Sequence, residues 1–171
     1  VRDFYWLKRH IPDDAHCVLT NVTSGMGVIS IMGPKARDLL QSLTPDDMSH
    51  KGFPFATSRE IELGYGYVRA SRITFVGELG WELHHPIEMQ NYLFDLLEKA
   101  GEKHGMKLVG ARAQNWLRQE KSYRAFGTEL GRDATPVEAD LPRFIDLSKE
   151  FHGKDAMLAH GVKSKCVTLL I

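Results

Sequence analysis

The chain has 171 residues, of which 43% are hydrophobic and 26% charged, as in an ordinary globular protein. Its 22 basic and 22 acidic residues cancel, and the basic ones are scattered, so the composition indicates neither a nucleic-acid nor a membrane surface. Only two cysteines are present, Cys17 and Cys166, far apart and in no metal-ligand spacing. We therefore expect two buried thiols in a reducing compartment and no bound metal.

The two ends of the chain predict a piece of a longer protein. The start, Val1 to Trp6, has neither an initiator Met nor the apolar core of a signal peptide. The last six residues, 166–171, have the composition of a strand that continues beyond them.

Hydrophobic periodicity and turn residues predict alternating strands and helices in the first half of the chain. The stretch V-I-S-I-M at 28–32 is typical of a strand, and Gly33-Pro34 opens a helix with a single apolar stripe. The expected elements are a helix at 2–10, strands at 16–23 and 26–32, a helix after 34, a loop at 44–56, and strands within 58–76 and at 81–84.

The second half contains the clearest helical pattern of the chain, between Pro86 and Gly105. After it we expect a helix at 110–121, a loop, a strand at 143–147, a short helix from 153 and a terminal strand. Strand-strand-helix blocks with long connections predict an α+β fold, with a mixed, largely antiparallel sheet and helices packed on one face.

One hairpin suggests a binding site. The sequence I-T-F-V-G-E-L-G-W-E-L at 73–83 predicts two strands joined by a four-residue loop, which would place Phe75 opposite Glu82. Directly opposed Cβ atoms lie roughly 5 Å apart, so a ring would lie beside a carboxylate. Such a pair suits a flat ligand with an amide or guanidine-like edge, such as a pterin. The alternative interpretation is a surface Glu beside a half-buried Phe on an ordinary hairpin.

Four blocks, in this order and spacing, resemble the aminomethyltransferase (glycine-cleavage T-protein) family. They are G-V-I-S-I-M-G-P-K-A-R at 27–37, F-V-G-E-L-G-W-E at 75–82, G-A-R-A-Q-N-W-L-R-Q-E at 110–120 with Y-R-A-F-G at 123–127, and T-P-V-E-A at 135–139 with F-H-G-K at 151–154. Within the family, the chain looks most like the folate-binding carboxy-terminal part of sarcosine dehydrogenase and dimethylglycine dehydrogenase.

The resemblance implies a single, partial folate-binding aminomethyltransferase-like domain over 1–171, without its upstream part and its carboxy-terminal barrel. Its implied activity is that tetrahydrofolate captures the one-carbon unit of an oxidised N-methyl amine as 5,10-methylenetetrahydrofolate. The implied cofactors are tetrahydrofolate here and FAD in a dehydrogenase half of the parent chain, because this chain has no G-x-G-x-x-G fingerprint. The implied location is the mitochondrial matrix in a eukaryote and the cytoplasm in a bacterium.

The resemblance also implies which residues contact folate. Glu82 would hold the pterin edge, Phe75 stands where an aromatic residue, usually Tyr, is expected, and Phe126 stands at a corner aromatic position. Gln114 replaces a folate-contacting arginine, so a cationic contact is lost there. The catalytic acid of the family would precede Val1, and no catalytic residue can be assigned.

Asp140 replaces a glycine that the family has after Thr-Pro-x-Glu-Ala. A non-catalytic alternative is a folate-sensing or scaffold module, which the regulatory subunit of pyruvate dehydrogenase phosphatase exemplifies in the same family.

Other polar and aromatic residues have simpler interpretations. His84 and His85 would face opposite sides of a strand, which makes them poor joint metal ligands. We expect Lys121 and Arg124 to form a solvated helix face, although a contact with the folate tail is the alternative. Arg118 and Glu120 should tie their helix to its surroundings, while Trp81 and Trp116 should be core residues.

Overall fold

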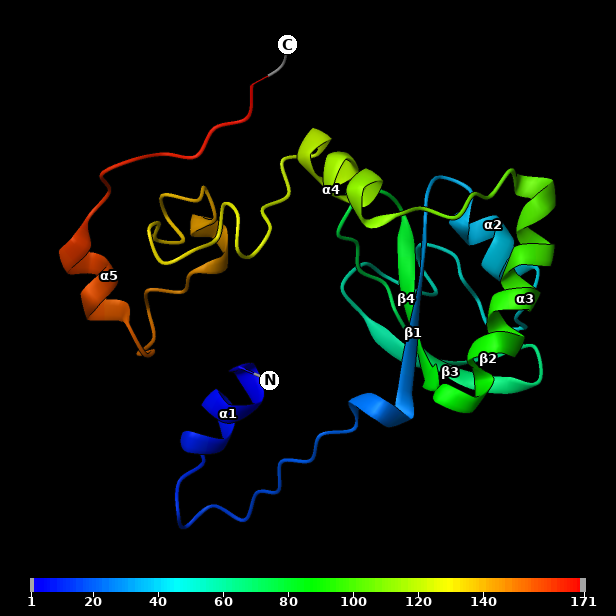
Figure 1. The fold of residues 1–171 in the computed structure, drawn as a ribbon, viewed down its shortest axis with the longest axis horizontal. Coiled ribbons are helices and arrows are strands. Elements are labelled where there is room, and N and C mark those ends of the chain that lie inside the picture. The colour runs from blue at the N-terminus through cyan, green and yellow to red at the C-terminus, as the bar shows by residue number, and fades with distance from the viewer. Residues whose placement is uncertain (1, 170–171) are drawn as a thin grey trace. The chain divides into compact units, whose positions relative to one another are not determined.

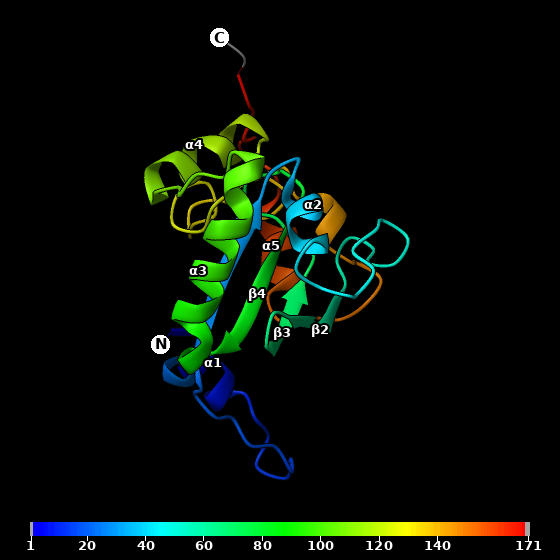
Figure 2. The same ribbon diagram turned by 90° about the vertical axis from the view of Figure 1, so that its right-hand side faces the viewer.

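The computed structural model describes residues 2–169, which divide into two compact units. The first contains the residues up to Thr74 together with Glu78–Leu108, and the second contains Phe75–Gly77 together with the residues from Val109 onward. Figures 1 and 2 show the chain in two views. The two units are described separately below.

The first unit is built on a four-stranded antiparallel sheet. Its strands are β1 (Met26–Met32), β2 (Ser58–Leu63), β3 (Gly66–Ser71) and β4 (Gly80–Pro86), in the order β1-β4-β3-β2. On each strand every second side chain points to the same face, so apolar residues at alternate positions gather on one face of the sheet.

Helices cover one face of this sheet. α2 (Ala36–Gln41) and α3 (Gln90–Gly101) lie on the same side of it in both views (Figures 1 and 2). Short 3-10 turns, Ile87–Met89 and Glu102–His104, flank α3. The core between helices and sheet contains the residues Ile31, Ala36, Leu39, Leu40, Met48, Phe53, Ile61, Leu63, Val68, Ala70, Trp81, Leu83, Leu93 and Leu97. The predicted α+β class, with helices on one face of an antiparallel sheet, is confirmed.

The amino-terminal segment confirms one prediction and contradicts another. A helix is present as expected, as α1 (Arg2–Arg9), but residues 16–23 do not form a strand. The chain instead reaches β1 through a 3-10 turn, Thr23–Gly25, before which the Asn21 side chain accepts a hydrogen bond from the Thr23 N–H at 3.0 Å. Residues typical of strands form one only where a neighbouring strand supplies hydrogen-bond partners.

The second unit has little regular structure. It contains α4 (Ala111–Glu120), a 3-10 turn at Pro142–Phe144 and α5 (Lys154–His160). The strand predicted at 143–147 is wrong, because the 3-10 turn occupies its start and Asp146 closes a turn by accepting the Ser148 N–H at 3.0 Å. Residues 161–169 form no strand, contrary to expectation, and 170–171 lie outside the described residues.

The predicted four-residue hairpin loop is also wrong. β3 ends at Ser71 and β4 begins at Gly80, so residues 72–79 form a longer connection. On the β2 side the pairing continues past Ser71, since the Arg72 N–H donates to the Thr57 carbonyl and the Arg72 carbonyl accepts the Ala56 N–H, both at 2.9 Å. The Arg72 guanidinium is buried and donates to the Phe53 carbonyl at 2.6 Å. On the β4 side the ladder stops, because the Ile73 N–H, which would be its next donor, turns back to the Ser71 carbonyl at 3.0 Å.

Candidate functional site

Glu82 projects from the face of the sheet that the helices leave open. Its neighbours on β4, Trp81 and Leu83, are fully buried on the helix-covered face, and strand alternation turns Glu82 to the other side. Its side chain is 29% exposed. Within residues 2–169 no hydrogen bond to its carboxylate is found, so the acceptor oxygens face outward without a hydrogen-bonding donor from the described part of the chain.

Serine residues flank Glu82 across the sheet. The antiparallel register places Ser30 of β1 opposite Glu82 on one side and Ser71 of β3 opposite it on the other. Ser58 of β2 follows in the same row, and the Ser71 hydroxyl donates to the Ser58 hydroxyl at 3.0 Å. A carboxylate that accepts and hydroxyls that can donate or accept therefore lie in one line across all four strands.

A second row lies beside the first. His84, two residues after Glu82 on β4, stands opposite Val28 of β1 and Arg69 of β3, and Arg69 stands opposite Glu60 of β2. His84 Nε2 lies 3.6 Å from Glu82 Oε2, an ion-pair distance when the imidazole is protonated. His85 is fully buried on the other face, where its ring nitrogens contact the Leu83 carbonyl and Gln90 Oε1, each at 2.9 Å.

The observed strand register does not place the Phe75 ring opposite Glu82, as the sequence predicted. Ser71, not Phe75, is the partner of Glu82, because the β3-β4 ladder ends at Ser71. Phe75 lies in a bend and belongs to the second unit. The opposed pair of ring and carboxylate on one hairpin is therefore wrong, although this leaves the roles of both residues untested.

Gln114 and Phe126 also lie in the second unit. Gln114 is exposed on the first half of α4, and Phe126 is 70% exposed and forms an isolated β-bridge with Leu130. Of the four residues that the family resemblance assigns to folate, the first unit therefore contains Glu82 alone.

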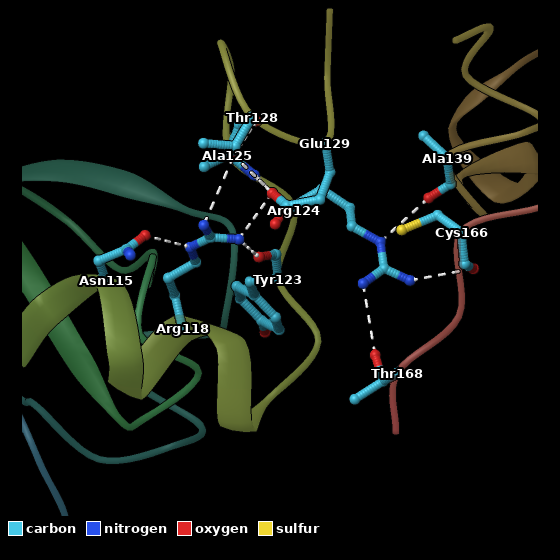
Figure 3. Close-up of polar contacts among 10 residues, drawn as sticks. All are labelled: Asn115, Arg118, Tyr123, Arg124, Ala125, Thr128, Glu129, Ala139, Cys166 and Thr168. Carbon is cyan, nitrogen blue, oxygen red and sulfur yellow. Dashed lines mark hydrogen bonds and ion pairs between the residues drawn. The ribbon is translucent and has the colours of Figure 1, made fainter. Parts of the chain in front are cut away.

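A buried guanidinium organises the second unit around α4. Arg118 is 1% exposed, and its guanidinium donates to Asn115 Oδ1 (2.9 Å), the Tyr123 carbonyl (2.9 Å), Thr128 Oγ1 (3.5 Å) and Glu129 Oε2 (2.7 Å) (Figure 3). The expectation that Arg118 ties its helix to the surroundings is confirmed.

The partner carboxylate of Arg118 is held in its ionised form. Burial alone would raise the pKa of Glu129, but hydrogen bonds from the Ala125 N–H (3.0 Å), the Thr128 hydroxyl (2.7 Å) and Arg118 outweigh burial and lower the pKa to about 2. Because all three donors converge on Oε2, this single carboxylate oxygen fixes the loop after α4.

Arg124 corrects another expectation. It lies past the end of α4 and is half-buried, so it is not part of a solvated helix face. Its guanidinium donates to the Ala139 carbonyl at 3.2 Å, and to Thr168 Oγ1 and the Cys166 carbonyl, both at 3.4 Å (Figure 3). Arg124 thus joins three segments of the second unit, whereas Lys121 is exposed as expected.

Sequence reasoning missed Glu138, which is 2% exposed. Its carboxylate accepts the N–H and hydroxyl of Thr135 at 2.8 and 3.0 Å, and the N–H groups of Lys163 and Ser164 at 2.8 and 3.2 Å. These hydrogen bonds, led by the one from the Thr135 N–H, lower the pKa of Glu138 to about 2. The T-x-x-E spacing of a capping box was the available signal, since Thr135 Oγ1 in turn accepts the Glu138 N–H at 3.2 Å.

Asp140 occupies a backbone position that suits glycine. Its φ is 63°, in the left-handed region that glycine enters without strain and that Asp tolerates better than most residues. A glycine, which the family resemblance implies at this position, would adopt the same backbone without strain.

Three expectations of burial are wrong. Cys17 is exposed, Cys166 is half-buried, and Trp116 is 71% exposed, although Trp81 is fully buried as predicted. Across residues 2–169, no group of three or more His, Cys, Asp or Glu side chains is arranged to hold a metal ion. In the same range no helix has both the length and the apolar character that a bilayer span requires.

Comparison with known proteins identifies the class. The model of the GCVT N-terminal domain family matches residues 1–149. The chain belongs to this family, as its four sequence blocks indicate.

Among its relatives is human mitochondrial dimethylglycine dehydrogenase, 37% identical over 177 residues that cover all of this chain and 20% of that protein. Human mitochondrial sarcosine dehydrogenase is 38% identical over 145 residues, which cover 84% of this chain and 16% of that protein. The aminomethyltransferase of Caldanaerobacter subterraneus subsp. tengcongensis is 36% identical over 153 residues, covering 87% of this chain and 41% of that protein. The chain therefore spans a fifth or less of the length of the two dehydrogenases.

Proposed function

We propose that the chain binds tetrahydrofolate and that the Glu82 carboxylate holds the 2-amino-pyrimidinone edge of the pterin. The observation that carries this proposal is the position of Glu82 on the open face of the sheet, 29% exposed and flanked by Ser30 and Ser71. An ionised carboxylate can accept two parallel N–H bonds from such an edge, which makes the contact strong and directional. Membership of the family supports folate as the ligand.

The serine hydroxyls in line with Glu82 offer further hydrogen bonds to a flat ligand. Ser71 and Ser58 continue the line that starts at Glu82, and their hydroxyls can pair with either donors or acceptors on the ligand. Phe75, Gln114 and Phe126 remain proposed folate contacts on the strength of the family resemblance alone. We assign no catalytic residue.

The proposed role is capture of a one-carbon unit. An N-methyl amine oxidised to its iminium form carries the carbon, which N5 and N10 of tetrahydrofolate take up as a bridging methylene. The two protons displaced from N5 and N10 leave on the demethylated amine, so the step is balanced without a further oxidant. The protein would orient the two reactants and exclude water, since a free iminium hydrolyses to formaldehyde.

The preceding oxidation is flavin chemistry in dehydrogenases of this type, and this chain does not supply a site for it. The sequence has no G-x-G-x-x-G nucleotide fingerprint, so we assign no step of the oxidation to these residues. The names of the human relatives support a mitochondrial location if the protein is eukaryotic, and a bacterial protein would be cytoplasmic.

A second candidate function is folate binding without catalysis, in a sensing or scaffold module. Two observations favour it. Gln114 cannot supply the positive charge of the arginine that it replaces, and the pyruvate dehydrogenase phosphatase regulatory subunit of mouse is 31% identical over 90% of this chain.

Titration of the chain with tetrahydrofolate tests the proposal. We expect Glu82→Ala to weaken binding by about 1.5–3 kcal/mol, roughly ten- to a hundredfold, because hydrogen bonds to a charged group are lost. Glu62→Ala is the matched control, since Glu62 is an exposed glutamate on β2 of the same sheet and its loss should leave the affinity unchanged. Equal affinities of the wild type and Glu82→Ala would reject the pterin contact.

A second assay separates the two candidate functions. Production of 5,10-methylenetetrahydrofolate from an N-methyl amine by the protein together with a flavin-dependent dehydrogenase of that amine, faster than free formaldehyde condenses with tetrahydrofolate, would support capture. Folate binding that depends on Glu82 without any such product would support the sensing module instead.

A further inference from the structure

His84 is the nearest ionisable neighbour of Glu82 on the open face of the sheet. The two side chains leave β4 on the same side, and His84 Nε2 lies 3.6 Å from Glu82 Oε2. They are 36% and 29% exposed, so both are reachable by a ligand and only partly screened by water. At this distance the attraction between them depends on whether the imidazole carries a proton.

Within the described sheet, the neighbouring strands place one charged residue directly opposite this pair. On the β1 side, Ser30 and Val28 stand opposite Glu82 and His84, and neither is charged. On the β3 side, Ser71 stands opposite Glu82, and the charged Arg69 stands opposite His84. Glu60 of β2 is the partner of Arg69, so the positive charge of Arg69 has its own acidic neighbour in the register.

We propose that His84 is a positioning residue of the Glu82 site, and that its protonation weakens folate binding by drawing the Glu82 carboxylate away from the ligand. This inference rests on the proposed function. A protonated imidazole next to Glu82 Oε2 competes for the same oxygen that a two-pronged pterin contact requires. A neutral imidazole leaves both oxygens to the ligand.

The size of the effect follows from the exposure of the pair. Ion pairs between partly exposed groups contribute modestly, which corresponds to a change in affinity of about two- to fivefold. Acidification favours the protonated imidazole and should therefore weaken binding. Affinity for folate is therefore expected to be higher at pH 8 than at pH 6.

The experiment measures the Kd of the chain for 5-formyltetrahydrofolate at pH 8 and pH 6. This ligand is suitable because its formylated N5 is not basic and its glutamate carboxylates stay ionised over the interval. We expect the wild type to bind about two- to fivefold more weakly at pH 6. His84→Gln, which cannot take up a proton there, should bind at pH 6 as the wild type binds at pH 8.

His84→Lys distinguishes charge from structure, because it places a permanent positive charge beside Glu82. It should bind at pH 8 about as weakly as the wild type binds at pH 6, so the two variants should shift affinity in opposite directions. Equal pH dependence in the wild type and His84→Gln would overturn the inference. A wild type whose affinity does not change with pH would overturn it as well.

Glu82→Gln separates failure of this inference from failure of the proposed function. If the wild type binds and Glu82→Gln does not, but His84→Gln keeps the wild-type pH dependence, only the role of His84 is rejected. If Glu82→Gln binds as tightly as the wild type, the pterin contact itself is rejected. Thermal unfolding of each variant verifies that the sheet is intact, and His84 should tolerate both changes because it projects from the open face.

Discussion

Replacement of Arg118 by Met should lower the free energy of opening of the loop after α4 more than the same replacement of an exposed residue on this helix. The variant keeps the apolar stem and removes a guanidinium that is 1% exposed and donates four hydrogen bonds. It leaves the Tyr123 carbonyl without that donor and leaves the Glu129 carboxylate without its cationic partner. Loss of one member of a buried ion pair costs about 3–5 kcal/mol.

That range must be lowered here, because the Glu129 side chain is 24% exposed and water can replace part of the lost interaction. The Ala125 N–H and the Thr128 hydroxyl also continue to donate to Glu129 Oε2. We therefore expect a loss of about 2–4 kcal/mol in the free energy of opening of the loop after α4.

Native-state hydrogen exchange is the suitable assay, because a chain of two compact units need not unfold in a single transition. The amides of Tyr123 and Ala125, which donate to the Arg118 carbonyl and to Glu129, report the opening of this loop directly. Arg112→Met is the matched control, since Arg112 is exposed on the same helix. Equal opening free energies in Arg118→Met and Arg112→Met, within about 0.5 kcal/mol, would refute the reasoning.

Two further predictions concern the second unit. The pKa values of Glu129 and Glu138 are both lowered to about 2 from an ordinary value of 4.5, so their stabilisation is fully present above pH 4.5 and is lost as the pH falls through 2. Opening free energies of the second unit, obtained from exchange rates corrected for the intrinsic pH dependence of exchange, should fall between pH 5 and 2.5, and constant values would contradict this. At Asp140, whose φ is 63°, a Val variant should be less stable than a Gly variant by about 1–3 kcal/mol in the opening free energy of the Leu141 amide, because a β-branched residue is strained in the left-handed region. A Val variant as stable as the Gly variant would show that this backbone position relaxes freely.

Local periodicity predicted the elements whose hydrophobic pattern lies entirely within their own residues. β1 and α3 were found where V-I-S-I-M and the helical pattern after Pro86 placed them. The early end of the β3-β4 pair could not be predicted in the same way, because the chain after β3 stays bonded through Arg72 to residues 56 and 57 beside β2. No short window around the hairpin contains those partners.

The same limit applies to the polar residues of the second unit. Glu138 is bound by the N–H groups of Lys163 and Ser164, about 25 residues further along the chain, so only the Thr135 half of its environment is visible in the sequence. The predicted burial of Trp116 was wrong for a different reason. Its size and its place in a helical pattern favoured burial, but burial requires a packing partner, and the pattern does not specify one.

The position of Glu82 depends on the core as much as on its own chemistry. Trp81, Leu83 and His85 are each 0% exposed on the covered face of β4, and their burial determines which side Glu82 and His84 occupy. A slip of one residue against β1 would turn the carboxylate into the core and the indole of Trp81 outward, at the cost of a buried, unpaired charge and a large loss of apolar burial. The alternation that builds the sheet thereby fixes Glu82 on the open face, where the proposed pterin contact requires its carboxylate to be.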